Sequence, residues 1–345
     1  MTRTVGIAGT AKNTGKTTAL NALLRAAHEH RTSVGVTSIG YDGESVDTVT
    51  GLPKPKIFLE AGTIAATAES CVPTTGWEVI EHTGLRTALG DVVILRCAAS
   101  GPIVLAGPNT RVGLAALLAR MSAHGPSLMC IDGALNRLAP MSLADGLVIA
   151  TGAAREADVS LLSKETEAIG ALFAIPLMDD APGPRDVVLR SPFQALDEVL
   201  AALDRARARH AASEPRGPTR VVCDALVGAP VLTALARLGS PALRVDEIVL
   251  RDPVTCLLAA PPLEMAQAVR SCLGAGIRVR VGARIPLLAV TINPFLPRPD
   301  GAHYVADAVS ADDLSDAMRQ ALRVPVVDVV REGPGALWQA VCPAR

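Results

Sequence analysis

A segment near the beginning of the sequence has the residue types of a phosphate-binding loop. Thr4 to Thr18 reads TVGIAGTAKNTGKTT, in which an apolar strand runs into a polar loop ending in Gly15-Lys16-Thr17-Thr18. In such a loop the backbone N–H groups surround an anion, the lysine contacts the β- and γ-phosphates, and the next hydroxyl binds Mg²⁺. The helix-forming run Ala19 to His28 adds unpaired donors at its N-terminus. We therefore predict a nucleotide-binding loop made of Gly9, Thr10, Ala11, Lys12, Asn13, Thr14, Gly15, Lys16, Thr17 and Thr18.

An apolar strand that ends in an Asp-Gly pair supplies the second half of a nucleoside triphosphatase site. Leu128 to Ile131 leads into Asp132-Gly133. The aspartate of such a strand lies across the metal from the threonine of the loop, and the glycine leaves room for the γ-phosphate. We expect Lys16 to face the ligand rather than to be packed, and Asp132 to act beside it.

A second strand, Ser33 to Gly40, leads into Asp42 and Glu44. The carboxyl ends of strands carry the site in open α/β sheets. We therefore predict that Thr17, Asp42 and Asp132 hold Mg²⁺, directly or through water, and that Lys16, Asp42 and Asp132 are the catalytic residues. For Asp42 the alternative is an Asp-Gly turn that needs no ligand.

Other polar residues follow strands on the same side of the predicted sheet. Asn109, Thr110 and Arg111 precede a helix and are candidates for a substrate or partner contact, although a capped helix start explains them too. Asn136 and Arg137 follow Asp132 and are candidates for the same contacts. In GTPases a base-reading Asn/Thr-Lys-x-Asp typically follows a later strand. Here that strand ends in Thr151-Gly-Ala-Ala, which favours ATP over GTP.

The elements that must position these residues alternate between short apolar strands and helices. This alternation predicts an α/β fold, a mostly parallel sheet of P-loop NTPase type with helices on both faces, followed by a second, smaller α/β domain. We place the nucleotide-binding domain at 1–180, a helix and linker at 181–218, and the C-terminal domain at 219–345. Two local predictions are a helix at Ile64 to Glu69 capped by Thr63, and a ligand-free turn at Asn293-Pro294.

Composition excludes several classes of function. The net charge is −1 and only 2% of the 345 residues are aromatic, so neither nucleic acid nor a membrane surface is an expected partner. The seven cysteines form no C-x-x-C pair and the six histidines lack ligand spacing, which indicates reduced thiols in a cytoplasmic protein. No signal peptide fits, because the first strand begins almost at Met1, and no apolar run is long enough to span a membrane. The sequence does not determine the oligomeric state, and a homo-oligomer is compatible with it.

The spacing of the loop resembles that of a particular branch of P-loop proteins. The usual pattern is G-x-x-x-x-G-K-[ST], but here Gly9 stands one position earlier and Thr10 occupies its place. This form resembles the branch that contains dethiobiotin synthetase and the cobyrinate and cobyrate amidases. The resemblance is specific at the loop only.

Taken together, the motifs resemble a narrower family. GTAKNTGKTT, SIGYDGE, GLPKPKIFLEAGTIAATAE and IDGALNR are similar to the KamB-type subunit of the lysine 5,6-aminomutase reactivase. The resemblance implies a P-loop ATPase that uses ATP and Mg²⁺ and acts with a MutS-like second subunit. Such a pair restores an adenosylcobalamin-dependent aminomutase whose cofactor has been damaged.

Two other classes compete with this interpretation. An ATP-dependent ligase of the dethiobiotin synthetase or cobyrinate amidase kind would transfer the γ-phosphate to a carboxylate, and the loop alone does not separate it from an ATPase. Its amidase version needs a nucleophilic cysteine with a histidine partner, and no such pair suggests itself in the second half. A chaperone that delivers a metal would need a Cys/His cluster, which the sequence does not suggest.

Overall fold

The computed structural model describes residues 2–42, 55–134, 139–183, 186–190, 196–210, 219–243, 245–301 and 303–343. The chain forms two compact units. Unit 1 comprises Met1–Thr166 and Pro286–Arg345, and unit 2 comprises Glu167–Ile285. The first boundary falls inside a helix, α3 (Val159–Phe173).

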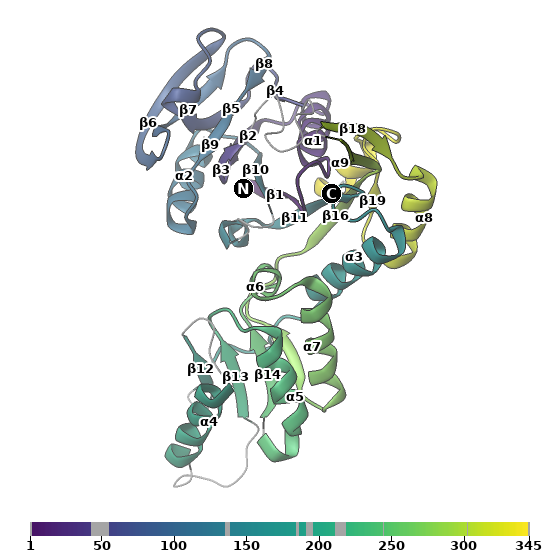
Figure 1. Cartoon of the computed structure of the whole chain (residues 1–345). Coiled ribbons are helices and arrows are strands. Elements are labelled where there is room, and N and C mark those ends of the chain that lie inside the picture. Colours follow the sequence, from purple (N-terminus) through teal and green to yellow (C-terminus); the bar gives the residue numbers. More distant parts are fainter. Residues whose placement is uncertain are drawn as a thin grey trace. The chain divides into compact units, whose positions relative to one another are not determined.

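Unit 1 is built on a nine-stranded sheet in the described part of the chain. In spatial order its strands are β19 (Val326–Val327), β16 (Leu287–Asn293), β11 (Gly146–Gly152), β1 (Arg3–Gly9), β10 (Leu128–Ala134), β2 (Val34–Ser38), β5 (Ile64–Ala68), β7 (Gly90–Cys97) and β6 (Trp77–Thr87). The strands from β19 to β5 pair in parallel, whereas β7 and β6 extend the sheet in antiparallel order. Because β1 lies between β10 and β11, its carboxyl end is bordered by both neighbours (Figure 1).

Helices cover both faces of this sheet. On one face, α1 (Lys16–Glu29) and α9 (Gly335–Val341) enclose a core that includes Ile7 of β1. On the opposite face, the 3₁₀ helix Ala139–Leu143 places Met141 against Gly6, and α2 (Arg111–Ala123) packs against that short helix. A further helix, α8 (Ala311–Ala321), contacts β16 and β19. The predicted α/β class, with a mostly parallel sheet, is therefore confirmed.

Among the residues that the structure describes, unit 1 also contains three two-stranded sheets. One pairs β3 (Gly40–Asp42) with β9 (Leu105–Gly107), and another pairs β4 (Ile57–Leu59) with β8 (Gly101–Ile103). The third is the hairpin of β17 (Phe295–Asp300) and β18 (His303–Ala308), which follows β16 directly.

The prediction of a helix at Ile64 to Glu69 is wrong, because Ile64–Ala68 is the strand β5 and Glu69–Cys71 is a 3₁₀ helix. β5 pairs with β2 on one side and with β7 on the other, and all five of its residues are buried. The sequence Ile-Ala-Ala-Thr-Ala prefers neither structure strongly, so pairing with two strands decides the outcome. Thr63 therefore caps no helix, and its carbonyl accepts from Cys97 N at 2.9 Å.

Unit 2 is a smaller α/β layer. Its sheet consists of β12 (Val187–Leu189), β13 (Thr219–Cys223), β14 (Val245–Leu250) and β15 (Arg278–Val281). These strands lie side by side in chain order, and all of them pair in parallel. Right-handed crossovers between consecutive parallel strands place the connecting helices on one face. These helices are α4 (Leu196–His210), α5 (Ala229–Leu243), α6 (Pro253–Ala259) and α7 (Pro262–Gly274), of which α5 contacts both α4 and α7.

The predicted division into 1–180, 181–218 and 219–345 differs from the one in the structure. Unit 2 is an insertion, because the chain returns to unit 1 at Pro286 and β16 pairs in parallel with β11. The helix α4, expected in a linker, belongs to unit 2, whereas β16, α8, β19 and α9 complete unit 1. The alternation of strands and helices continues through the insertion, so the sequence pattern does not mark where the chain changes sheets.

No helix in the described ranges is both long and apolar enough to cross a lipid bilayer.

Candidate nucleotide-binding site

The predicted loop connects the carboxyl end of β1 to the first turn of α1. Gly15 is the residue before the helix and has a φ of 86°, a left-handed conformation that favours glycine. Asn13 is also left-handed, with a φ of 63°. The loop closes on itself where the Thr14 hydroxyl donates to the Ala11 carbonyl at 3.0 Å. Strand, loop and helix therefore follow one another as the sequence predicts, with Lys16, Thr17 and Thr18 in the first turn of α1.

Lys16 and Asp132 form a close ion pair beneath this loop. The Lys16 Nζ lies 2.9 Å from each of the two carboxylate oxygens of Asp132. β10 aligns Asp132 with Ile7 of β1, which brings the carboxylate under the loop. The side chain of Asp132 is 0% exposed and that of Lys16 only 12%. The expectation that Lys16 is exposed rather than packed is therefore wrong, because the amine compensates a buried negative charge.

A second strand supports the loop from the other side. Asn293, the last residue of β16, donates from its side-chain Nδ2 to the Asn13 carbonyl at 2.9 Å. Its Oδ1 accepts from the Phe295 backbone N–H at 3.2 Å. A Cβ added to Gly15 would lie 3.2 Å from the Asn293 Cβ, so Asn293 also limits the space at that position. The turn predicted at Asn293-Pro294 is therefore wrong, because Asn293 ends β16, β17 begins at Phe295, and the Asn293 side chain contacts the loop.

The end of β11 holds the first residue of the loop. The Thr10 backbone N–H donates to the Ala150 carbonyl at 2.9 Å, and the Thr10 hydroxyl donates to that of Thr151 at 3.0 Å. The sequence pattern gives Thr151 no role in the loop, because only the residues after it bear on the choice between ATP and GTP. Thr151 and Asn293 share one feature, which is that each stands at or near the carboxyl end of a strand, β11 or β16. Only the sheet order shows that β16 lies next to β11, and that β11 lies next to β1.

The sequence predicts that Gly133 leaves room for a γ-phosphate, but protein side chains lie beside it. A Cβ added there would lie 2.3 Å from the Met141 Cε and 3.3 Å from the Ile39 Cδ1. The space beside Gly133 is thus filled by protein side chains, and close packing explains the glycine without a γ-phosphate.

The remaining predicted residues fall into two groups. Asp42 ends β3, whose backbone pairs with β9, and the structure does not describe the Asp42 side chain. Glu44, Asn136 and Arg137 lie outside the described residues. Thr110 is the N-cap of α2, where its hydroxyl accepts from the Gly113 N–H at 3.1 Å. Arg111 donates to the Ser142 hydroxyl at 3.2 Å. Thr110 and Arg111 therefore both have structural roles.

Three buried cysteines, Cys130, Cys223 and Cys272, lack the character of catalytic nucleophiles. Burial raises the pKa of Cys130 strongly, with smaller contributions from Cys342 and Asp132. Burial also raises the pKa of Cys272 to about 11 and that of Cys223 to about 12. A thiolate, the reactive form, is therefore disfavoured at neutral pH. Among the residues that the structure describes, no three His, Cys, Asp or Glu side chains gather as metal ligands.

No protein-family model and no curated protein matches this chain.

Proposed function

We propose that the chain binds and hydrolyses ATP at the loop between β1 and α1. The observation that carries this proposal is the pairing of Lys16 with Asp132, 2.9 Å apart, directly below a loop that ends in the left-handed Gly15. A lysine at the start of a helix and a carboxylate at the end of the neighbouring strand are the two charged groups that phosphoryl transfer from a nucleotide requires. Thr151 and Asn293 hold the loop from the next two strands.

The chemistry follows from an exchange of partners. A triphosphate offers Lys16 a second anionic partner, and the lysine then stabilises negative charge on the β- and γ-phosphates. Asp132 is released toward the loop, where its oxygens and the Thr17 hydroxyl are the hard donors that Mg²⁺ prefers. These two residues would hold the ion, which supplies positive charge for the transfer. Asp42 is a third candidate, through water.

The proposed biological role is a reactivating factor for an adenosylcobalamin-dependent aminomutase of the lysine 5,6-aminomutase type. Its support is the similarity of the four motifs to the KamB-type subunit. In this role the chain performs no chemistry on the amino acid. ATP drives a conformational cycle, which requires that the nucleotide bind two states of the complex unequally. The partners are a MutS-like second subunit and the aminomutase.

The nucleotide part is tested by titrating MgATP and MgGTP into the parent chain and a Lys16→Ala variant. We expect tight MgATP binding by the parent, weaker MgGTP binding, and loss of both in the variant. Because Lys16 compensates a buried carboxylate, the variant's fold is checked by circular dichroism. If the alanine variant unfolds, a Lys16→Arg variant, which keeps the positive charge, is titrated in its place. Equal ATP affinity in folded parent and variants would refute the nucleotide site.

The reactivase role is tested by mixing the chain, MgATP and an inactivated aminomutase with its second subunit, followed by fresh adenosylcobalamin. We expect recovery of mutase activity that depends on ATP and on Lys16. The ligase alternative predicts a different result, in which activity never recovers and a diamino or dicarboxylate compound accelerates phosphate release. That outcome would replace the reactivase role but keep the nucleotide site.

A further inference from the structure

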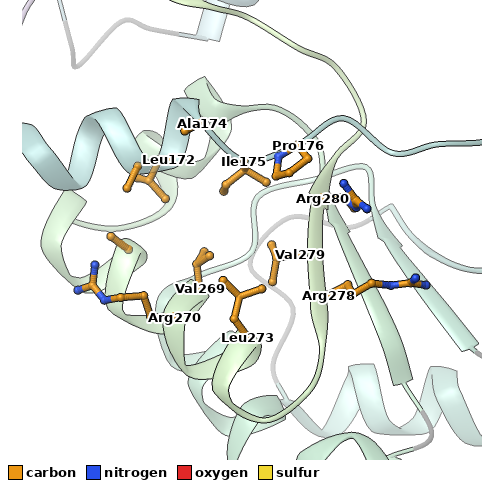
Figure 2. A pocket seen from close by; sticks show the side chains of 12 residues that line it. Leu172, Ala174, Ile175, Pro176, Val269, Arg270, Leu273, Arg278, Val279 and Arg280 are labelled. Carbon is orange, nitrogen blue, oxygen red and sulfur yellow. The ribbon is translucent and has the colours of Figure 1, made fainter. Parts of the chain in front are cut away.

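Unit 2 contains a cavity of about 460 Å³, which is lined by residues of this unit alone (Figure 2). It lies between the last residues of α3, the segment 174–176, the helix α7 and the strand β15. Cavities that bind small organic molecules typically measure about 300–1,000 Å³. The volume therefore suits a small ligand.

The wall of the cavity is aliphatic. Leu172, Ile175, Val269 and Val279 line it, and each of them is buried. Leu273 lines it too but is 54% exposed, so this side chain borders solvent. Such a wall favours the alkyl part of a ligand, because burying apolar surface is favourable and no polar wall group needs a partner there.

The charged residues that line the cavity are all arginines. Figure 2 shows Arg270, Arg278 and Arg280 around the aliphatic side chains. Arg278 and Arg280 approach the buried carboxylate of Glu247, with Nε–O distances of 3.3 and 3.8 Å. Arg270 donates only to a neutral acceptor, the Gln267 Oε1, at 2.9 and 3.3 Å. Within the described residues, its positive charge has no acidic partner.

We propose that this cavity binds a small organic anion with an aliphatic body and a carboxylate or phosphate head group. The alkyl body occupies the space between Leu172, Val269 and Val279, and the head group meets the guanidinium of Arg270. Guanidinium groups bind carboxylates and phosphates through paired hydrogen bonds, which an alkylammonium ligand cannot form. The proposal is independent of the nucleotide site, which belongs to unit 1.

The full-length chain is titrated by calorimetry with octanoate, octyl phosphate and octyltrimethylammonium at equal ionic strength. The first two carry the proposed chemistry and separate a carboxylate ligand from a phosphate ligand, and the third has the same alkyl body with the opposite charge. We expect saturable 1:1 binding of at least one anion, about tenfold or more tighter than the cation, as a charge-assisted hydrogen bond allows. Failure of both anions to bind, or equal binding of the cation, would overturn the proposal.

Variants locate the binding in the cavity. Ala171 lines the cavity at an exposed position, so Ala171→Trp fills space at little cost in packing and should abolish binding. Ala201→Trp, at an exposed position of α4, is the matched control and should bind like the parent. Arg270→Gln should weaken the anions about tenfold and leave the cation unchanged.

Lys16→Ala should leave the anions unaffected, which separates this cavity from the nucleotide site. Thermal melting verifies that each variant is folded. If Ala171→Trp does not fold, the exposed Arg270→Gln decides the question. Unchanged anion affinity in Arg270→Gln, or in folded Ala171→Trp, would show that the anions bind elsewhere.

Discussion

The side-chain amide of Asn293 donates a 2.9 Å hydrogen bond to the backbone carbonyl of Asn13, 280 residues earlier in the chain. Asn13 has a left-handed backbone, which costs free energy in a residue other than glycine. A donor at the carboxyl end of β16 helps to keep this conformation. The strand that follows the insertion therefore supports the loop that precedes it.

Asn293→Asp removes this hydrogen bond and adds a negative charge beside the loop, whereas Asn293→Ala removes the hydrogen bond without adding charge. The aspartate keeps an oxygen for the Phe295 N–H but has no donor for the Asn13 carbonyl. Losing a hydrogen bond worth about 1 kcal/mol should weaken MgATP binding about fivefold. Asn293→Ala should show at least the same loss. Calorimetric titration measures both affinities, and parent-like binding by the two folded variants would contradict a role for Asn293 in positioning the loop.

Asp132→Asn should retain nucleotide binding while it lowers ATP hydrolysis by about a hundredfold or more, as expected for losing one charge-stabilising group. The measurement is steady-state phosphate release at saturating MgATP. Asn is similar in size to Asp, so packing changes little. Hydrolysis at the parent rate would remove Asp132 from the catalytic residues.

The ion pair also predicts a non-additive effect on stability. Lys16→Ala leaves the buried Asp132 carboxylate without this cation, a change that typically costs about 3–5 kcal/mol. The double variant Lys16→Ala/Asp132→Asn removes the charge as well, so we expect it to be more stable than Lys16→Ala. Urea unfolding of the parent, both single variants and the double variant measures the coupling. Additive free energies of unfolding would mean that the pair does not interact in solution.

The insertion predicts that residues 1–180 do not fold alone. This fragment lacks β16 and α9, and its core would lose Ala289, Leu337 and Val341, which pack with β1 and α1. We expect the fragment to unfold without a cooperative transition and to bind no MgATP. The full-length chain is the control. A fragment that melts cooperatively and binds MgATP would support the division into 1–180 and 219–345 instead.

A carboxylate between α2 and β6 makes stability depend on pH. Glu81 accepts from Arg120 and lies 2.7 Å from the His124 Nε2. The His124 and Arg120 contacts lower the pKa of Glu81 below its ordinary value of 4.5. A depressed pKa adds stability above the unfolded value, and this contribution is lost as the pH falls through the folded value.

The partly exposed position of Glu81 limits the effect to about 0.5 kcal/mol. Glu81→Gln should therefore reduce the free energy of unfolding at pH 7 by that amount and show no difference from the parent well below pH 4. Urea unfolding at the two pH values checks this. A difference that grows toward low pH would have the wrong sign for this ion pair.

The sequence by itself determines the local parts of the nucleotide site. The run from Thr4 to Thr18 encodes a strand, a loop and a helix start, because apolar alternation, glycine and helix-forming residues act over short distances. The apolar run before Asp132-Gly133 predicts a buried strand for the same reason, although β10 continues past this pair to Ala134. The α/β class follows from the repetition of such segments along the chain.

Tertiary structure alone decides which strand ends meet. Asn293 and Thr151 contact the loop because β16 and β11 lie side by side, and sheet order depends on pairings between residues far apart in sequence. Ile64–Ala68 becomes a strand because β2 and β7 pair with both of its edges. Lys16 is packed, because β10 brings the buried Asp132 within hydrogen-bonding distance of it. These outcomes are set by pairing and burial, which a local sequence pattern does not contain.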